Sequence, residues 1–207
     1  MKKLLLTTMI TSMLILPFGT VALAENQEAS ASAPVPETEY ITGSVPAESS
    51  LTQVLAPTVH AIVLAMNNQD VCQYTPADQN ISWEALYNLL SMYGQMDERS
   101  EYVDNMLVIP SETVSDFACA LMGTPVSPED IPETLQDRMT YDSDADQYVL
   151  VCGNDSLSQV QFKDSGEEDL YGSLIYLVDG TPLSSFRVMV EQADNLLGYQ
   201  ITALELA

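Results

Sequence analysis

The spacing of apolar residues changes once along this chain, and that change constrains the fold more than any other feature. Before residue 124, apolar side chains recur every three or four positions, the period of an α-helix with one buried face. From Arg138 onward they recur at every second position, as in strands whose two faces differ. A helical part followed by a β-rich part predicts an α+β fold.

The first two helical segments have clear boundaries. Residues 51–68 (LTQVLAPTVHAIVLAMNN) form the first, in which Pro57 either kinks the helix or marks its first turn. Residues 81–94 (ISWEALYNLLSMYG) form the second. Glu84 is expected in its first turn and Gly94 at its C-terminal cap.

The third helix is the clearest. It is expected over residues 111–123 (SETVSDFACALMG), directly after a short strand over 106–110 (MLVIP). These segments complete a helical part over residues 51–123. Residues 124–135 (TPVSPEDIPETL) contain three prolines and predict a stiff connector.

The last part of the chain, residues 136–207, is expected to form one antiparallel sheet. Short strands separated by turn signals such as Asp179-Gly180 are typical of such sheets. The expected strands are 138–141, 147–152, 158–163, 170–178, 184–191 and 198–207. We therefore expect about three N-terminal helices packed on one face of a C-terminal antiparallel β-sheet, as a single domain over residues 51–207.

The N-terminus has the pattern of a signal peptide over residues 1–24. Lys2 and Lys3 precede an apolar run, and Ala22-Leu23-Ala24 provides a small-x-small cleavage site. An uncleaved membrane anchor is the alternative, because the run is nearly long enough to span a bilayer. The sequence favours cleavage and export, so we expect the protein outside the cell or at the cell surface.

Residues 25–50 (ENQEASASAPVPETEYITGSVPAESS) are rich in Ala, Ser, Pro and Glu and show no apolar period. This composition predicts a disordered, acidic spacer that tethers the folded part.

The charge of the chain limits its partners. Asp and Glu number 30 against 6 Lys and Arg, a formal net charge of −24. Without Lys2 and Lys3 the net charge would be about −26. So negative a chain repels nucleic acid and anionic membranes. It suits solubility alone, a cationic partner or a divalent metal ion.

Three aspartates, Asp142, Asp144 and Asp146, alternate with other residues between two tyrosines in YDSDADQY. An EF-hand calcium loop would need Gly at its sixth position and Glu at its twelfth, where this chain has Gln147 and Gly153. The sequence favours a solvated turn between two strands. A weak, extracellular-type calcium site at these aspartates is the alternative, and no other cofactor is expected.

A second acidic turn follows the strand over 158–163. Its carboxylates are Asp164, Glu167, Glu168 and Asp169. If the two acidic turns lay at one end of the sheet, they could share a cation, although solvated loop charge is the simpler interpretation.

No catalytic constellation is evident. His60 is the chain's one histidine and has apolar neighbours, so we expect it to be packed or partly exposed on its helix. Glu84 beside Trp83 is the nearest candidate for a carboxyl with a raised pKa, but its place in a first turn explains it. The sequence therefore favours a non-enzymatic protein.

The simplest interpretation of the cysteines and aromatic residues is structural. Cys72, Cys119 and Cys152 allow one disulfide and a leftover thiol, with Cys119 expected to be buried. The aromatics are expected to fill the core, although such faces also bind sugars or peptides. They are Trp83, Tyr87 and Tyr93 on a helix, and Tyr171, Tyr176 and Tyr199 on strands.

The runs LVIPSETVSDFACALMG and IPETLQDRMTYDSDADQYVLVCG, with the short strands that follow, resemble uncharacterised exported proteins of gut-type Firmicutes (Clostridia-like). The likeness covers residues 102–207, its motifs are structural, and no established activity carries over. The order of helices and then sheet also resembles NTF2-like domains, which implies a pocket between sheet and helices and no particular reaction.

Three functions follow as hypotheses. The first is an exported, acidic, non-enzymatic binding domain that recognises a protein or glycan at the cell surface. The second is a small NTF2-like pocket enzyme or ligand carrier. The third is a weak calcium-binding surface protein.

Overall fold

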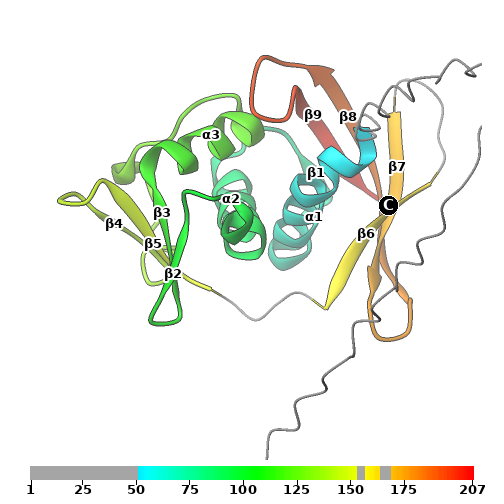
Figure 1. Ribbon diagram of the computed structural model, residues 1–207. Helices are drawn as coiled ribbons and strands as arrows, with labels where there is room; N and C mark the ends of the chain where they lie inside the picture. Colours follow the sequence, from blue (N-terminus) through cyan, green and yellow to red (C-terminus); the bar gives the residue numbers. More distant parts are fainter. Residues whose placement is uncertain (1–50, 153–156, 164–168) are drawn as a thin grey trace, which may run out of the picture. The chain divides into compact units, whose positions relative to one another are not determined.

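The structure is a computed structural model that describes residues 51–152, 157–163 and 169–207 (Figure 1). The predicted signal peptide and spacer lie outside the described residues. None of the helices in the described residues combines the length and the apolar composition that a membrane span needs.

Three helices follow the predicted apolar periods. They are α1 (Leu51–Gln69), α2 (Gln79–Tyr93) and α3 (Ser111–Met122). Helix α1 packs along α2, and α2 also contacts α3. Pro57 lies inside α1, beyond its first turn. The alternative in which Pro57 begins the helix is therefore wrong.

Five strands form the larger sheet, here called sheet A, in the order β1–β9–β8–β7–β6, all antiparallel. Their bounds are Gln73–Tyr74 (β1), Ser158–Lys163 (β6), Asp169–Tyr176 (β7), Pro182–Gln192 (β8) and Tyr199–Leu206 (β9). Helix α1 packs on β6 and β7 of this sheet.

Four strands form the smaller sheet, here called sheet B, in the order β2–β3–β5–β4, also antiparallel. Their bounds are Glu101–Val103 (β2), Met106–Pro110 (β3), Met139–Asp142 (β4) and Gln147–Val151 (β5). Asp104 and Asn105 join β2 to β3 with φ angles of 51° and 65°, as a two-residue type I′ hairpin turn requires. Helix α3 packs on β3 and β5.

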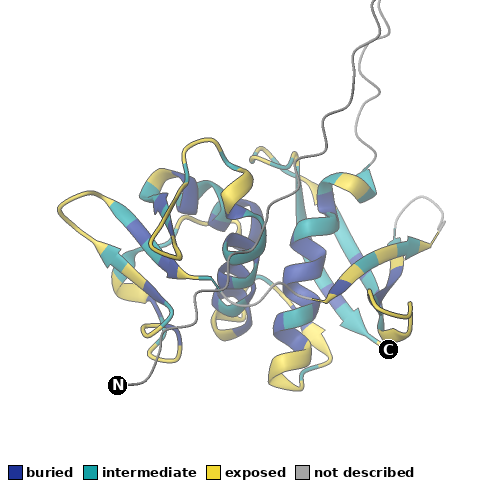
Figure 2. Ribbon diagram, turned by 60° about the horizontal axis from the view of Figure 1, so that its bottom comes forward, coloured by how far each residue is buried: buried dark blue, intermediate teal, exposed yellow. Residues whose placement is uncertain are grey.

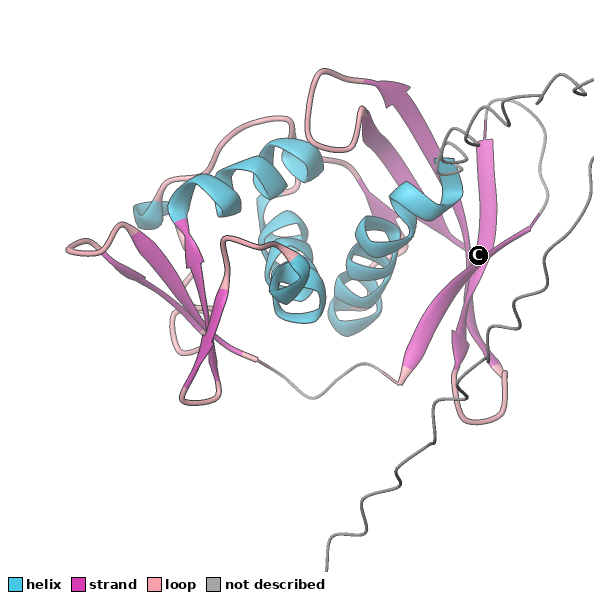
Figure 3. Cartoon of the chain, viewed as in Figure 1, coloured by secondary structure: helices cyan, strands magenta, loops and turns pink. Residues whose placement is uncertain are grey.

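The predicted α+β class, with three helices and antiparallel strands, is confirmed (Figure 3). The strands divide between two sheets, however, instead of forming one. The reason is β3: this strand from the helical part pairs with β5 and gives the β4–β5 hairpin a sheet of its own. Helices α1 and α2 consequently lie between two sheets (Figure 3).

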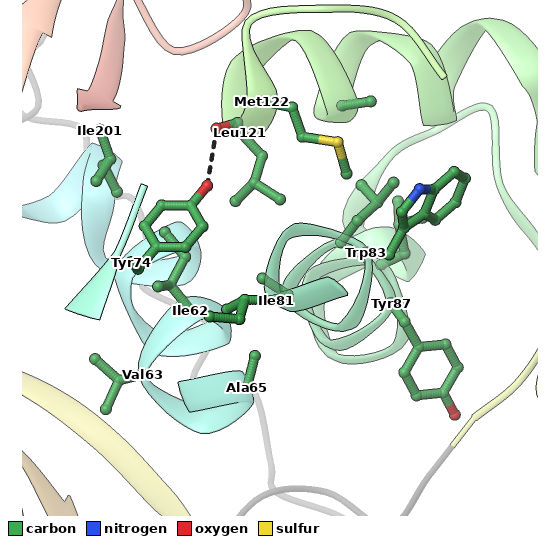
Figure 4. Packing of buried hydrophobic residues seen from close by; sticks show 14 of the residues in the cluster. Ile62, Val63, Ala65, Tyr74, Ile81, Trp83, Tyr87, Leu121, Met122 and Ile201 are labelled. Carbon is green, nitrogen blue, oxygen red and sulfur yellow. Dashed lines mark hydrogen bonds between the residues drawn. The ribbon is translucent and has the colours of Figure 1, made fainter. Parts of the chain in front are cut away.

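The apolar cluster between the helices and the sheets forms the core (Figures 2 and 4). Trp83 on α2 is 1% exposed, and its ring packs among aliphatic side chains of the cluster. Tyr74 of β1 is also buried, and its hydroxyl donates a hydrogen bond to the carbonyl of Leu121 on α3 at 3.2 Å (Figure 4). This bond satisfies the buried phenol and ties sheet A to α3.

Two glycines end helices for different reasons. Gly123 directly follows α3, as predicted, and caps it in the left-handed conformation with a φ of 76°. The predicted C-terminal cap of α2 at Gly94 is confirmed, with a right-handed φ of −60° that continues into a 3₁₀ turn over Gly94–Met96. A Cβ at Gly94 would lie 3.0 Å from Ile109 Cδ1 and 3.2 Å from Leu107 Cδ2. Close packing on β3 explains this glycine.

The connector over residues 124–135 contains no strand, and its one helical turn is the 3₁₀ helix Pro128–Asp130. It carries the chain from the end of α3 to β4. Ile131 and Leu135 from the connector are buried in the core cluster.

Candidate functional site

The three aspartates lie where the sequence predicts, in a turn between two strands. Strand β4 ends at Asp142, β5 begins at Gln147, and the two residues are paired in the ladder. Tyr141 and Tyr148 are also opposite each other, with ring centroids 5.1 Å apart. The predicted hairpin is confirmed.

Hydrogen bonds within the turn occupy two of the three carboxylates. Asp142 Oδ1 accepts from the backbone N–H groups of Asp144 and Ala145 at 3.0 and 3.3 Å. Asp146 Oδ1 accepts from the Tyr141 hydroxyl at 2.7 Å, and Asp146 has a φ of 52°. Self-bonding of this kind is what favours aspartate in turns, and it accounts for the motif without an ion.

No group of three or more His, Cys, Asp or Glu in the described residues has the arrangement of a metal site. Calcium binding at Asp142, Asp144 and Asp146 stays a prediction. Of the second acidic turn, Asp164, Glu167 and Glu168 lie outside the described residues. Asp169 accepts two hydrogen bonds from the Arg187 guanidinium, the shorter at 2.6 Å.

A pocket of about 370 Å³ opens beside the aspartate turn, between β4–β5 and the first turns of α3. We call it the hairpin pocket. Its lining combines three carboxylates, two tyrosines and two serines with two apolar residues: Glu112, Asp116, Asp146, Tyr141, Tyr148, Ser111, Ser115, Val126 and Pro128. The backbone N–H of Ser111 donates to the Asp146 carbonyl at 3.1 Å, so the helix start and the turn are joined directly.

The pocket carries negative charge. Hydrogen bonds from the hydroxyls of Ser111 and Tyr141 lower the pKa of the Asp146 carboxyl below its usual value, so Asp146 is ionised at neutral pH. Burial raises the pKa of Tyr148 to about 12, which leaves its phenol neutral. Asp116 pairs with the Arg99 guanidinium at 3.0 Å.

His60 is buried, which is one of the two placements expected for it, and a hydroxyl group lies next to each of its ring nitrogens. Its Nδ1 lies 2.7 Å from the Tyr93 hydroxyl on α2, and its Nε2 lies 3.1 Å from Ser158 Oγ on β6. Burial lowers the pKa of His60 to about 4. Ser158 is only 6% exposed, so this Ser-His pair is enclosed in the core and presents no nucleophile to a substrate.

Glu84 has a different structural role from the one expected. Helix α2 begins earlier than predicted, at Gln79, with Asp78 as its N-cap accepting from the Ile81 N–H. Glu84 therefore lies in the second turn, and the first-turn interpretation is wrong. Its carboxylate accepts two hydrogen bonds from Arg138, at 2.9 and 3.2 Å.

The substitution Arg138→Met is expected to destabilise the protein by about 2 kcal/mol, because it leaves the Glu84 carboxylate, 12% exposed, without its charged partner. The guanidinium also lies 4.6 Å from the centre of the Tyr87 ring. Urea unfolding of Arg138→Met and of the double variant with Glu84→Gln measures this. The double variant should recover most of the loss. A single variant within about 0.5 kcal/mol of the parent would contradict the assigned role.

The prediction that the aromatic residues fill the core is confirmed on α2 and for Tyr199 of β9, which packs against the core cluster, and it fails for Tyr171. Trp83 and Tyr87 are buried in the core cluster, and Tyr93 is half-buried beside His60. Tyr171 faces solvent on the outer side of sheet A, 42% exposed, and Tyr199 is half-buried.

None of the three cysteines is joined in a disulfide. Cys119 is half-buried instead of buried, because it lies beside the apolar stripe of α3 that contains Val114, Ala118 and Leu121. Cys72 is exposed.

Ser111, Glu112 and Asp116 were not predicted as neighbours of the aspartate turn. The pairing of Pro110 with Gln147 brings the start of α3 next to the start of β5. Both strands are short and largely apolar on both faces, and this shared pattern could have suggested their pairing.

No protein-family model, curated protein or solved structure matches this chain. The resemblances to exported Firmicutes proteins and to NTF2-like domains stay predictions.

Proposed function

We propose that the chain is an exported, acidic, non-enzymatic binding domain whose hairpin pocket takes a positively charged group of a partner protein or peptide. One observation carries the proposal: three carboxylates and a half-exposed tyrosine ring line one pocket. Carboxylates attract an ammonium or guanidinium group, and an aromatic face adds a cation–π contact.

Charge balance within the pocket supports this ligand class. Arg99 is the one basic residue paired with a pocket carboxylate in the described part of the chain. Asp146 is ionised, and Glu112 is exposed in the first turn of α3. The helix N-terminus offsets only part of this charge. An anionic ligand would meet three carboxylates and be repelled.

The geometry gives less support to the other two functions. The space that an NTF2-like pocket would need, between the helices and the sheets, contains the buried apolar cluster. The histidine that an acyl-transfer site would need lies within that core. A calcium site would compete with the hydrogen bonds that Asp142 and Asp146 already make in the turn.

Calorimetry with two short peptides tests the proposal. Acetyl-Gly-Lys-Gly-amide should bind, and its neutral counterpart acetyl-Gly-Gln-Gly-amide should not. The double variant Glu112→Gln with Asp116→Asn should weaken binding of the lysine peptide about five- to tenfold, because it removes two charges from the pocket.

A matched control keeps the net charge equal. Glu133→Gln with Glu191→Gln removes two exposed carboxylates elsewhere and should change the affinity less than about twofold. Equal weakening by both double variants would show attraction to the negative surface in general and would contradict a pocket. Binding of neutral oligosaccharides, with none of the lysine peptide, would assign the pocket to glycans.

A further inference from the structure

The outer face of sheet B carries five adjacent aliphatic side chains. Their neighbours along the strands, such as Leu107 and Leu150, are buried in the core, and strand alternation therefore turns these five away from the helices. They are Val103, Met106, Val108, Val149 and Val151. Across the sheet, Met106 is opposite both Val103 and Val151.

Three of these side chains are exposed to solvent in the described part of the molecule, and Val108 and Val149 are half-buried. Val103 and Val151 are each 47% exposed and Met106 is 38% exposed. Figure 2 shows that much of the β2–β3 hairpin is exposed. Strand β2 is also an edge strand of sheet B.

The sequences of β3 (MLVIP) and β5 (QYVLV) have the pattern of strands buried on both faces. Strands of a sheet with one solvent-exposed face alternate apolar and polar residues, whereas strands of a sheet covered on both faces have continuous apolar runs. Sheet A provides the contrast within the same chain. Its outer face carries polar side chains at Gln161, Lys163, Ser185 and Arg187, beside the exposed Tyr171. The apolar outer face of sheet B is therefore the pattern of a face that a partner covers.

Charge decides which partner fits. Glu101 borders the aliphatic face on β2, Asp104 lies in the adjoining turn and Asp142 lies at the end of β4. A second copy of this chain, with a net charge of −24, would bring like charges together. A partner that is itself basic meets no such repulsion.

We propose that the outer face of sheet B docks a basic amphipathic segment of another protein. Apolar side chains of that segment cover Met106 and its valine neighbours, while its Lys or Arg side chains face the acidic border. This surface is separate from the hairpin pocket, because Tyr148 of the pocket lies on the opposite face of the sheet.

Two peptides of equal charge separate apolar docking from simple attraction. One alternates Lys with Val and the other alternates Lys with Ser. By fluorescence anisotropy in about 150 mM salt, where long-range attraction is screened, the Lys-Val peptide should bind at least about tenfold more tightly.

Variants locate the site. The triple variant Val103→Thr, Met106→Thr and Val151→Thr keeps strand-forming residues and should reduce Lys-Val binding about tenfold or more, without changing Lys-Ser binding. The matched control Val178→Thr, Leu183→Thr and Leu196→Thr removes three other exposed aliphatic side chains and should leave both peptides unaffected. Circular dichroism and urea unfolding establish that each variant is folded.

Three results would overturn the proposal: equal binding of the two peptides, equal loss in the two triple variants, or dimerisation of the parent that the sheet B variant abolishes. The last would make a second copy the occupant of this face. The Glu112→Gln with Asp116→Asn variant distinguishes this surface from the proposed function, because it should weaken the Gly-Lys-Gly peptide and leave the Lys-Val preference over Lys-Ser intact.

Discussion

Between pH 7 and pH 4, the free energy of unfolding is expected to fall by about 3 kcal/mol because of His60 alone. The imidazole has a pKa of about 4 in the folded protein, against an ordinary value of 6.5. Above pH 6.5 it is neutral in both states. As the pH falls below 6.5, the unfolded chain takes up a proton that the folded core excludes, so stability is lost until about pH 4.

The physical cause is the surroundings of the ring. His60 is 3% exposed, and its two nitrogens contact the hydroxyls of Tyr93 and Ser158. A hydroxyl can donate to or accept from a neutral imidazole, but neither hydroxyl supplies a negative charge for an imidazolium. Desolvation therefore dominates and favours the neutral form.

The measurement compares the parent with His60→Gln by urea unfolding at several pH values. The carboxylates titrate in both proteins, so their contribution cancels in the difference. His60→Gln should be less stable than the parent at pH 7. Between pH 7 and pH 4, the difference in free energy of unfolding should shift by about 3 kcal/mol in favour of the variant. A gap that stays constant with pH would show that His60 titrates alike in both states.

The second large effect is expected at Gly172 in β7, where Gly172→Ala should destabilise the protein by about 3 kcal/mol. Gly172 is paired with Phe162 on one side and Phe186 on the other. The two phenyl rings meet edge to face across the glycine, with centroids 5.6 Å apart. An added Cβ would collide with the Phe186 ring and lie 2.7 Å from the carbonyl oxygen of Gln161.

Urea unfolding of Gly172→Ala measures this effect, with Ser173→Ala on the same strand as the control. The control should lose less than about 1 kcal/mol, because the Ser173–Ser185 hydrogen bond is long, at 3.5 Å. Adding Phe186→Leu to Gly172→Ala should recover only part of the loss, since the backbone contact with Gln161 remains. Gly172→Ala as stable as the parent would disprove the close packing.

The elements of this fold could be predicted because their signals are local. The apolar stripe of α3, the left-handed cap at Gly123 and the aspartate turn between two tyrosines are each set within a few residues. The class follows from the order of those elements. Local period does not choose strand partners, so the pairing of β3 with β5, and with it the second sheet, was not predicted.

The candidate site was predicted in part. Asp146 and Tyr141 were identified as neighbours in a turn. Ser111 and Glu112 lie beside them only because β3 pairs with β5, which places the start of α3 next to the start of β5. The same holds for polar pairs from distant segments, such as Glu84 with Arg138. Spacing in a sequence cannot reveal such a pair, because tertiary packing alone brings its members together.

Chemical-shift mapping by NMR shows directly whether the hairpin pocket receives a cationic group. In a titration with acetyl-Gly-Lys-Gly-amide, we expect saturable shifts concentrated at Ser111, Glu112, Tyr141 and Asp146. Shifts spread evenly over acidic residues far from the pocket, or absent from these four, would contradict it.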